Sequence, residues 1–266
     1  MLALNDFSFE FAGRYLFKNA SWHIKPNEKI GLVGLNGTGK STLLRLISGD
    51  YELREGTLSK PSDLRIGFLN QDLLSMDIGD CVRDVVLSGR DDLVYLEQEI
   101  NRLIEKIEVE YDDVTMQRLA DAQERFGALG GYEWHAEGDK ILEGLGFPTS
   151  SLTRSLREFS GGWRMRAMLG KLLLQAPDLL LLDEPAAGLS PSERSDMMRG
   201  VKALAAEGTT VLYTEHNMDA VFGVADRVLV LMNGRLVAEG LPHEVAANPL
   251  VQERYLGASF AETQNA

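Results

Sequence analysis

Cysteine and basic residues are scarce in this sequence. Cys81 is the single cysteine among 266 residues, so the chain can form no internal disulfide, which is typical of a protein kept in a reducing compartment. Lysine and arginine number 27 against 40 aspartates and glutamates, which gives a formal net charge of −13. This balance disfavours broad, nonspecific contact with nucleic acid or anionic lipid, and it leaves room for a local basic patch. We expect a cytoplasmic protein.

Long apolar runs are absent too. Even the stretch 168–182 is interrupted by Lys171, Gln175 and Asp178, so it does not reach the length needed to cross a bilayer. No signal peptide is recognisable, and we expect no direct insertion into a membrane. Hydrophobic residues make up 44% of the chain, which suits one large α/β domain with a helical insertion.

Residues 34–41 match the phosphate-loop pattern G-x-x-x-x-G-K-[ST]. An apolar strand pattern precedes them and a helical pattern follows, which is the context that this motif needs. A glycine-rich turn without a ligand would explain the glycines but not the Lys-Ser pair. Lys40 is predicted to reach the β- and γ-phosphates, and Ser41 to bind Mg²⁺. The nucleotide-binding residues predicted in and beside this loop are Gly34, Asn36, Gly37, Gly39, Lys40, Ser41 and Thr42.

Four consecutive leucines, residues 179–182, precede Asp183-Glu184-Pro185. This pattern predicts a buried parallel strand that ends in two carboxylates, the form of a Walker B segment. Asp183 is predicted to hold Mg²⁺ through water, and Glu184 to polarise the attacking water. The chain should therefore bind a nucleotide and Mg²⁺ and hydrolyse the nucleotide, and the resemblance described next implies that this nucleotide is ATP.

Each of three further segments, considered alone, does not indicate a function. Gln71 follows an apolar strand pattern, residues 160–162 read Ser-Gly-Gly, and His216 follows the apolar strand 211–214. A Ser-Gly-Gly segment is usually a loop, and a lone histidine after a strand is usually a structural residue. Together with the phosphate loop and the Asp-Glu pair, however, their order resembles the ATPase domain of the ATP-binding cassette (ABC) superfamily over nearly the whole chain. The resemblance implies an α/β P-loop NTPase of ABC type, with an antiparallel β subdomain and a helical subdomain that contains a helical hairpin.

The resemblance also implies roles for individual residues. Phe11 falls where an aromatic ring stacks on adenine, although a core aromatic of an N-terminal strand is an equal alternative. Gln71 corresponds to a glutamine that contacts Mg²⁺, and His216 to a switch histidine that bonds the γ-phosphate. Ser160, Gly161 and Gly162 correspond to the signature that grips the nucleotide held by a second cassette, so a head-to-tail dimer, most simply a homodimer, is expected.

Two residues depart from the family pattern. Trp163 stands where a glutamine usually follows the two glycines, and Ser190 stands where the loop after Walker B often ends in aspartate. The first leaves the serine and backbone donors of the signature in place. The second replaces a residue of the loop through which, in this family, two paired sites communicate.

The patterning divides the chain into four parts. Residues 1–71 are the nucleotide-binding core, 72–158 a helical region, 159–257 the remainder of the core, and 258–266 a fraying tail. In the helical region, apolar residues at strict three-four spacing form a seam, and a polar break at 111–113 predicts a helical hairpin over about 91–126. The seam consists of Leu93, Leu96, Ile100, Leu103 and Ile107. An Asn-Gly turn at 233–234 predicts a β-hairpin between 228–232 and 235–238.

A finer resemblance divides the chain near Pro185. Before it, segments such as 68–71, 132–133 and 159–166 are similar to the ABC-F branch, whose members usually carry two cassettes and act on ribosomes through an arm in the helical region. After it, segments 186–191, 215–218, 225–227, 248–249 and 255–257 are similar to the ATP-binding subunit of branched-chain amino-acid importers. A natural or engineered chimera is therefore expected.

Three functions follow as alternatives. The chain is an ATPase subunit that drives a membrane permease at the inner face of the plasma membrane, a ribosome-associated ATPase of ABC-F type, or a nucleotide-binding scaffold without turnover. Residues 91–126 hold eleven acidic and four basic side chains, a net charge of −7, which disfavours direct contact with rRNA. The presence of Glu184 and His216 argues against the scaffold.

Overall fold

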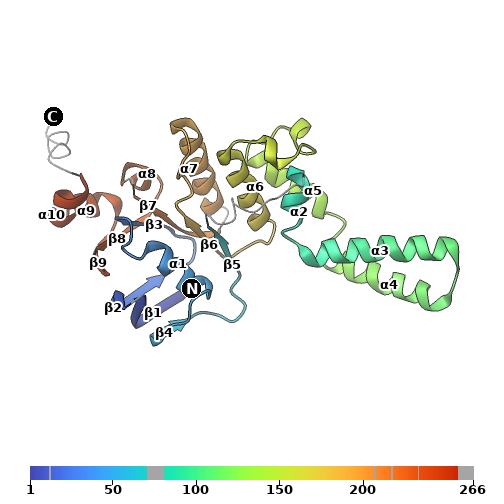
Figure 1. Ribbon diagram of the computed structural model, residues 1–266, viewed down its shortest axis with the longest axis horizontal. Helices are drawn as coiled ribbons and strands as arrows, with labels where there is room; N and C mark the ends of the chain where they lie inside the picture. The colour runs from blue at the N-terminus through green and yellow to red at the C-terminus, as the bar shows by residue number, and fades with distance from the viewer. Residues whose placement is uncertain (12, 71–80, 207, 217, 233, 257–266) are drawn as a thin grey trace. The chain divides into compact units, whose positions relative to one another are not determined.

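The structure, a computed structural model, describes residues 1–11, 13–70, 81–206, 208–216, 218–232 and 234–256 (Figure 1). The chain forms two compact units. The core unit consists of residues 1–75 and 177–266, and the helical unit of residues 76–176. Gln71 and the predicted tail lie outside the described residues. In the described part of the chain, no helix combines the length and apolar character needed to cross a membrane.

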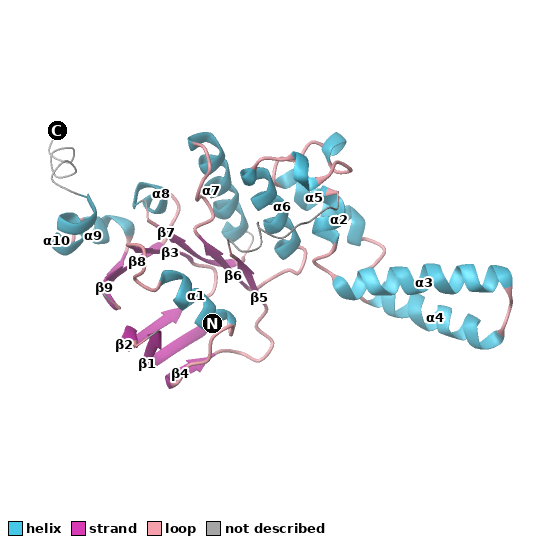
Figure 2. Ribbon diagram, in the orientation of Figure 1, coloured by secondary structure: helices cyan, strands magenta, loops and turns pink. Residues whose placement is uncertain are grey.

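The described residues of the core unit form two β-sheets (Figure 2). The larger has the strand order β5-β6-β7-β3-β8-β9, in which β9 alone runs antiparallel to its neighbour. Its strands are β3 Lys29–Gly34, β5 Ile66–Leu69, β6 Leu179–Asp183, β7 Thr210–Glu215, β8 Arg227–Met232 and β9 Arg235–Gly240. The smaller sheet is antiparallel, with the order β2-β1-β4, formed by β1 Leu2–Phe11, β2 Arg14–Ile24 and β4 Glu55–Ser59. The predicted α/β class, the antiparallel subdomain and the β8–β9 hairpin are confirmed.

The central parallel strands are fully buried. All four leucines at 179–182 are 0% exposed, as expected for strands covered on both faces. In the pairing register, Asp183 of β6 lies opposite Thr214 of β7, and Val33 of β3 lies opposite Glu215. Because parallel strands end at the same edge, the ends of β3, β6 and β7 meet there.

Helix α1 (Lys40–Ser48) follows β3 directly after the phosphate loop. Its apolar side chains enter a core cluster that also contains residues of both sheets. This packing fixes the first turn of α1, and with it the loop, against the ends of the parallel strands. The other helices of the core unit are α7 Pro191–Ala206, α8 Met218–Phe222, α9 Pro242–Ala246, α10 Pro249–Val251 and the π-helix η4 Gln252–Leu256.

The helical unit contains the predicted hairpin (Figure 1). Its helices α3 and α4 run side by side and contact each other. Three leucines of the predicted seam, Leu93, Leu96 and Leu103, are buried. At the turn, Asp112 accepts a hydrogen bond from the backbone N–H of Thr115 at 2.8 Å and so caps α4. The elements of the unit are α2 Val82–Leu87, α3 Asp91–Val109, α4 Asp113–Ala128, α5 Trp134–Gly144, η2 Thr149–Ser151, η3 Leu156–Glu158 and α6 Gly161–Leu173.

The division between the units differs from the boundary at residues 158 and 159 that patterning suggested. Residues 159–176 group with the helical unit, because α6 packs on α2 and α5. At Gly170 of α6, a Cβ atom would lie 3.1 Å from Val86 and 3.2 Å from Leu145, so the helices approach closely there. The Ser-Gly-Gly segment therefore belongs to the helical unit.

Candidate nucleotide-binding site

The loop between β3 and α1 has the conformation that its glycines permit. Gly37 and Gly39 have φ angles of +77° and +104°, in the left-handed region that residues with a Cβ atom seldom adopt. The loop is closed by Thr38, whose hydroxyl donates to the carbonyl oxygen of Leu35 at 2.8 Å. Backbone N–H groups in such a loop, together with the N-terminus of α1, favour an anion.

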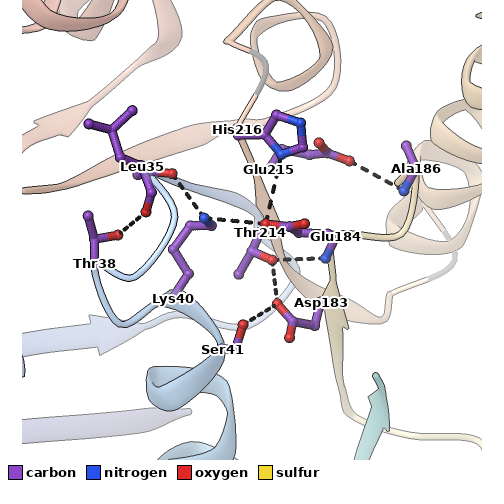
Figure 3. A network of polar contacts seen from close by, with 11 residues as sticks. Leu35, Thr38, Lys40, Ser41, Asp183, Glu184, Ala186, Thr214, Glu215 and His216 are labelled. Atoms are coloured by element: carbon purple, nitrogen blue, oxygen red, sulfur yellow. Dashed lines mark hydrogen bonds and ion pairs between the residues drawn. The ribbon is translucent and has the colours of Figure 1, made fainter. Parts of the chain in front are cut away.

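Lys40 connects this loop to the predicted Walker B segment (Figure 3). Its Nζ donates to the carbonyl oxygen of Gly34 at 2.9 Å and lies 3.3 Å from Oε1 of Glu184. The residue is only 5% exposed. A buried ammonium group is tolerated where it is paired and hydrogen-bonded, and these two partners meet that need.

A second set of contacts centres on Asp183 (Figure 3). Its Oδ1 accepts a hydrogen bond from the Ser41 hydroxyl at 3.0 Å and another from the Thr214 hydroxyl at 2.8 Å. The Thr214 hydroxyl oxygen in turn accepts from the backbone N–H of Glu184 at 2.9 Å. The phosphate loop, the end of β6 and the end of β7 are thus joined in one network.

Glu184 lies between two groups that can carry positive charge. Besides its contact with Lys40, its Oε1 is 3.8 Å from Nδ1 of His216, whose side chain is about half exposed. The backbone of Glu184 has a φ angle of +49°, which is rare for a residue other than glycine. The side chain reaches toward the phosphate loop from this unusual turn (Figure 3).

Thr214 and Glu215 are members of the network that sequence reasoning missed. Glu215 is 3% exposed, and its Oε1 accepts from the backbone N–H of Ala186 at 3.3 Å. Burial raises the pKa of the Glu215 carboxyl above its usual value, and the hydrogen bond from Ala186 and the charge of His216 oppose that rise. Both residues lie at the end of an apolar strand, directly before His216. That position was the only feature of the sequence that could have indicated their part in the site.

A cavity of about 480 Å³ adjoins the network. This volume suits a ligand the size of a nucleotide. Phe11 borders the cavity and is 52% exposed. It is therefore not a core aromatic, which was the alternative interpretation of this residue. The lining consists of Phe11, Leu16, Asn36, Gly37, Gly39, Lys40, Ser41, Thr42, Asp183 and Glu184.

The predicted signature residues lie in the helical unit. Ser160 is the N-cap residue of α6, and Gly161 and Gly162 form its first turn. Ser160 and Gly161 are exposed at this helix N-terminus, where backbone N–H groups and the helix dipole favour a phosphate. Gln71, the remaining predicted residue, lies outside the described residues.

Packing explains both departures from the family pattern. The Trp163 ring lies 4.8 Å from that of Phe147 and has the guanidinium of Arg166 above it at 4.6 Å, so the residue stabilises the helical unit. Ser190 exchanges hydrogen bonds with Glu193, since its backbone N–H donates to the carboxylate at 3.0 Å and its hydroxyl accepts from the Glu193 N–H at 3.3 Å. This reciprocal pair is a capping box at the start of α7.

Fold and site together define an α/β P-loop ATPase cassette. A family model described as "ABC transporter" matches residues 17–187. The chain therefore belongs to the ABC transporter family.

Individual relatives agree with this assignment. ABC transporter F family member 2 of Arabidopsis thaliana is 36% identical over 189 residues, which cover 68% of this chain and 28% of that protein. The uncharacterized ABC transporter ATP-binding protein YfmM of Bacillus subtilis (strain 168) is 33% identical over 188 residues, 70% of this chain and 36% of that protein. The chain thus matches about a third of each relative's length. A solved nucleotide-free ATP-binding cassette from an ABC transporter is similar over 97% of this chain and 99% of that one, with 25% identity and a TM-score of 0.70.

Replacement of the buried lysine tests the phosphate loop. Lys40→Ala is expected to lower the affinity for ATP at least about tenfold, because a charge-assisted contact contributes roughly 1.5–3 kcal/mol. Lys60→Ala, which removes an exposed lysine of the same unit, is the matched control and should bind ATP as the unmodified chain does. Equilibrium titration with a fluorescent ATP analogue measures both. Equal affinity of the two variants would contradict the assignment of the loop.

Proposed function

We propose that the chain binds and hydrolyses MgATP at the cavity beside Lys40, as one cassette of a pair. The observation that carries this proposal is the network that joins Ser41, Lys40, Asp183 and Glu184 at the ends of β3 and β6. It combines a cation for phosphate, oxygen ligands for a metal ion and a carboxylate for water. These are the groups that phosphoryl transfer to water requires.

The oxygen atoms at this site suit Mg²⁺. Ser41 Oγ and Asp183 Oδ1 lie 3.0 Å apart, and both are hard oxygen atoms of the kind that magnesium prefers. Ser41 would bind the ion directly and Asp183 would hold it through water. Magnesium is commonly held by one or two protein oxygens together with substrate phosphates and water, so a pair of ligands is sufficient. When bound, the ion supplies positive charge to the β- and γ-phosphates. Gln71 remains a third predicted ligand.

The side chains then have distinct roles in hydrolysis. Glu184 accepts a hydrogen bond from a water molecule and orients its oxygen toward the γ-phosphorus. As the new oxygen–phosphorus bond forms, the bond from the γ-phosphorus to the bridging oxygen breaks, and ADP and phosphate result. The proton released from water passes through the Glu184 carboxylate to solvent. Lys40 stabilises the charge on the phosphate oxygens, and His216 donates a hydrogen bond to the γ-phosphate.

Replacement of the catalytic carboxylate separates hydrolysis from binding. Glu184→Gln is expected to lower the turnover number about a hundredfold or more, because an amide cannot accept the proton of water. ATP affinity should stay close to that of the unmodified chain. Glu52→Gln, at an exposed glutamate of the core unit, controls for the lost charge. Unchanged phosphate release by the Glu184 variant would remove this residue from the proposed role.

We further propose that two copies pair head to tail. In this arrangement Ser160, Gly161 and Gly162 of one copy face the γ-phosphate on Lys40 of the other. Support comes from the exposed position of Ser160 and Gly161 at the N-terminus of α6, a helix of 13 residues. The pair then holds two sites, and each copy supplies the phosphate loop of one site and the signature segment of the other.

Mixing two inactive variants tests the pairing. Lys40→Ala and Ser160→Arg are each expected to be nearly inactive alone. A one-to-one mixture should recover about a quarter of the normal phosphate release, because half of randomly formed pairs are mixed and each mixed pair holds one complete site.

The control is a mixture of Lys40→Ala with Glu184→Gln. Lys40 and Glu184 belong to the same side of each site, the side that the signature segment of the other copy faces. In a mixed pair each site therefore lacks one of the two residues, and no activity should return. Recovery in both mixtures, or in neither, would argue against head-to-tail pairing.

A membrane permease is the partner that we favour. The solved transporter cassette is similar over nearly the whole chain. The sequence segments after Pro185 resemble the ATP-binding subunit of branched-chain amino-acid importers. Cytoplasmic loops of membrane proteins are rich in lysine and arginine, which a cassette of net charge −13 complements.

A ribosome-associated function of ABC-F type is the second candidate. It is favoured by the similarity to the Arabidopsis F family member and by the α3–α4 hairpin, which lies in the helical region where the resemblance implies an ABC-F arm. The net charge of −7 over residues 91–126 opposes contact of the hairpin with rRNA. A chimera of the two types remains a prediction from the sequence.

Fractionation of cells that express Glu184→Gln distinguishes these partners. This variant should keep ATP and hence the paired state, and we expect it to be retained in the membrane fraction and to crosslink to an integral membrane subunit. Sedimentation with ribosomes would support the ABC-F type instead. Lys40→Ala, whose affinity for ATP should be at least about tenfold lower, is the control. Recovery of the Glu184 variant in neither fraction would contradict both candidates.

A further inference from the structure

We propose that Thr214 and Glu215 are positioning residues that hold the Glu184 turn in its productive conformation. The role rests on the proposed hydrolysis of ATP and extends it to two residues that the motif pattern does not include. Thr214 and Glu215 do not themselves line the cavity. Thr214 hydrogen-bonds to two lining residues, Asp183 and Glu184. They act through the backbone of residues 184–186.

The turn needs support from its surroundings. Glu184 has a φ angle of +49°, and a residue with a Cβ atom persists there only where neighbouring contacts favour that conformation. The turn is also the point where the chain leaves the buried strand β6. A small backbone rotation at Glu184 would redirect its carboxylate away from Lys40.

Thr214 supplies one such contact with a single hydroxyl group. It accepts from the N–H of Glu184 at 2.9 Å and donates to Oδ1 of Asp183 at 2.8 Å. The residue is 0% exposed, so water does not replace either bond. One hydroxyl therefore fixes both the backbone of Glu184 and the side chain of Asp183.

Glu215 supplies the other contact. Its buried carboxylate accepts from the N–H of Ala186 at 3.3 Å, two residues further along the same turn. Hydrogen bonds to a carboxylate are stronger than those between neutral groups. Together the last two residues of β7 hold both ends of the segment 184–186 to the edge of the central sheet.

The consequence is an effect on turnover rather than on ATP affinity. ATP affinity depends on the phosphate loop, which neither residue contacts. Turnover depends on the direction of the Glu184 carboxylate, and a misplacement of about 1 Å in a reacting group can lower a rate roughly a hundredfold.

Matched pairs of variants test this role. Thr214→Val keeps the shape but removes the hydroxyl, and it should lower kcat at least about tenfold while the Kd for MgATP changes less than about twofold. Thr214→Ser keeps the hydroxyl and should recover most of kcat. Glu215→Gln keeps an acceptor for Ala186 and should be nearly normal, whereas Glu215→Met should lower kcat as Thr214→Val does.

Amide hydrogen exchange provides a readout that does not depend on turnover. The N–H groups of Glu184 and Ala186 should be protected in the unmodified chain and exchange faster in Thr214→Val and Glu215→Met, respectively. If the unmodified chain did not hydrolyse ATP, the proposed function would fail, and exchange would still decide whether the turn is held.

Some outcomes would overturn the positioning role. These are equal kcat for Thr214→Val and the unmodified chain, equal loss in Thr214→Ser and Thr214→Val, or a loss confined to ATP affinity. If a lowered melting temperature showed that Thr214→Val is unfolded, the comparison of Glu215→Gln with Glu215→Met would test the positioning role by itself. Equal kcat and equal exchange for Glu215→Gln and Glu215→Met would then reject the role.

Discussion

The buried ammonium group of Lys40 is the constraint on which the geometry of the site depends. It satisfies its hydrogen-bonding needs with the carbonyl oxygen of Gly34 and the carboxylate of Glu184, which belong to segments about 150 positions apart in the sequence. A charge that is 5% exposed requires such partners, because desolvation without compensation is strongly unfavourable. The same side chain therefore closes the phosphate loop and fixes the direction of the carboxylate.

The strand order of the larger sheet makes this contact possible. β7 lies between β6 and β3, so its end is a neighbour of both the Asp-Glu pair and the start of the phosphate loop. Thr214 bonds to Asp183 from this position, and Asp183 bonds to Ser41. Parallel strands bring their carboxyl ends to one edge, and that edge collects, from distant parts of the chain, the groups proposed to bind phosphate and to activate water.

The helical unit carries a different set of constraints. Its predicted signature segment begins α6, while Trp163 directly after it packs on Phe147 and beneath Arg166. Trp163, which departs from the family pattern, is thus partly buried against neighbours of the same unit. Ser190 in the core unit is similarly occupied as the cap of α7. Both substitutions serve local stability, which separates them from the groups proposed to act on ATP.

The sequence by itself determined the fold class, the helical hairpin and the local motifs, because these depend on short-range periodicity, glycine conformations and caps. The phosphate loop and the Asp-Glu pair were recognisable for the same reason, and Asp183, Glu184 and Lys40 do lie together. Only the tertiary structure decided that Thr214 and Glu215 join them, and that residues 159–176 pack with the helical unit. Such contacts depend on the order of strands and the packing of helices, and residues that meet through these long-range arrangements leave no periodic signal along the chain.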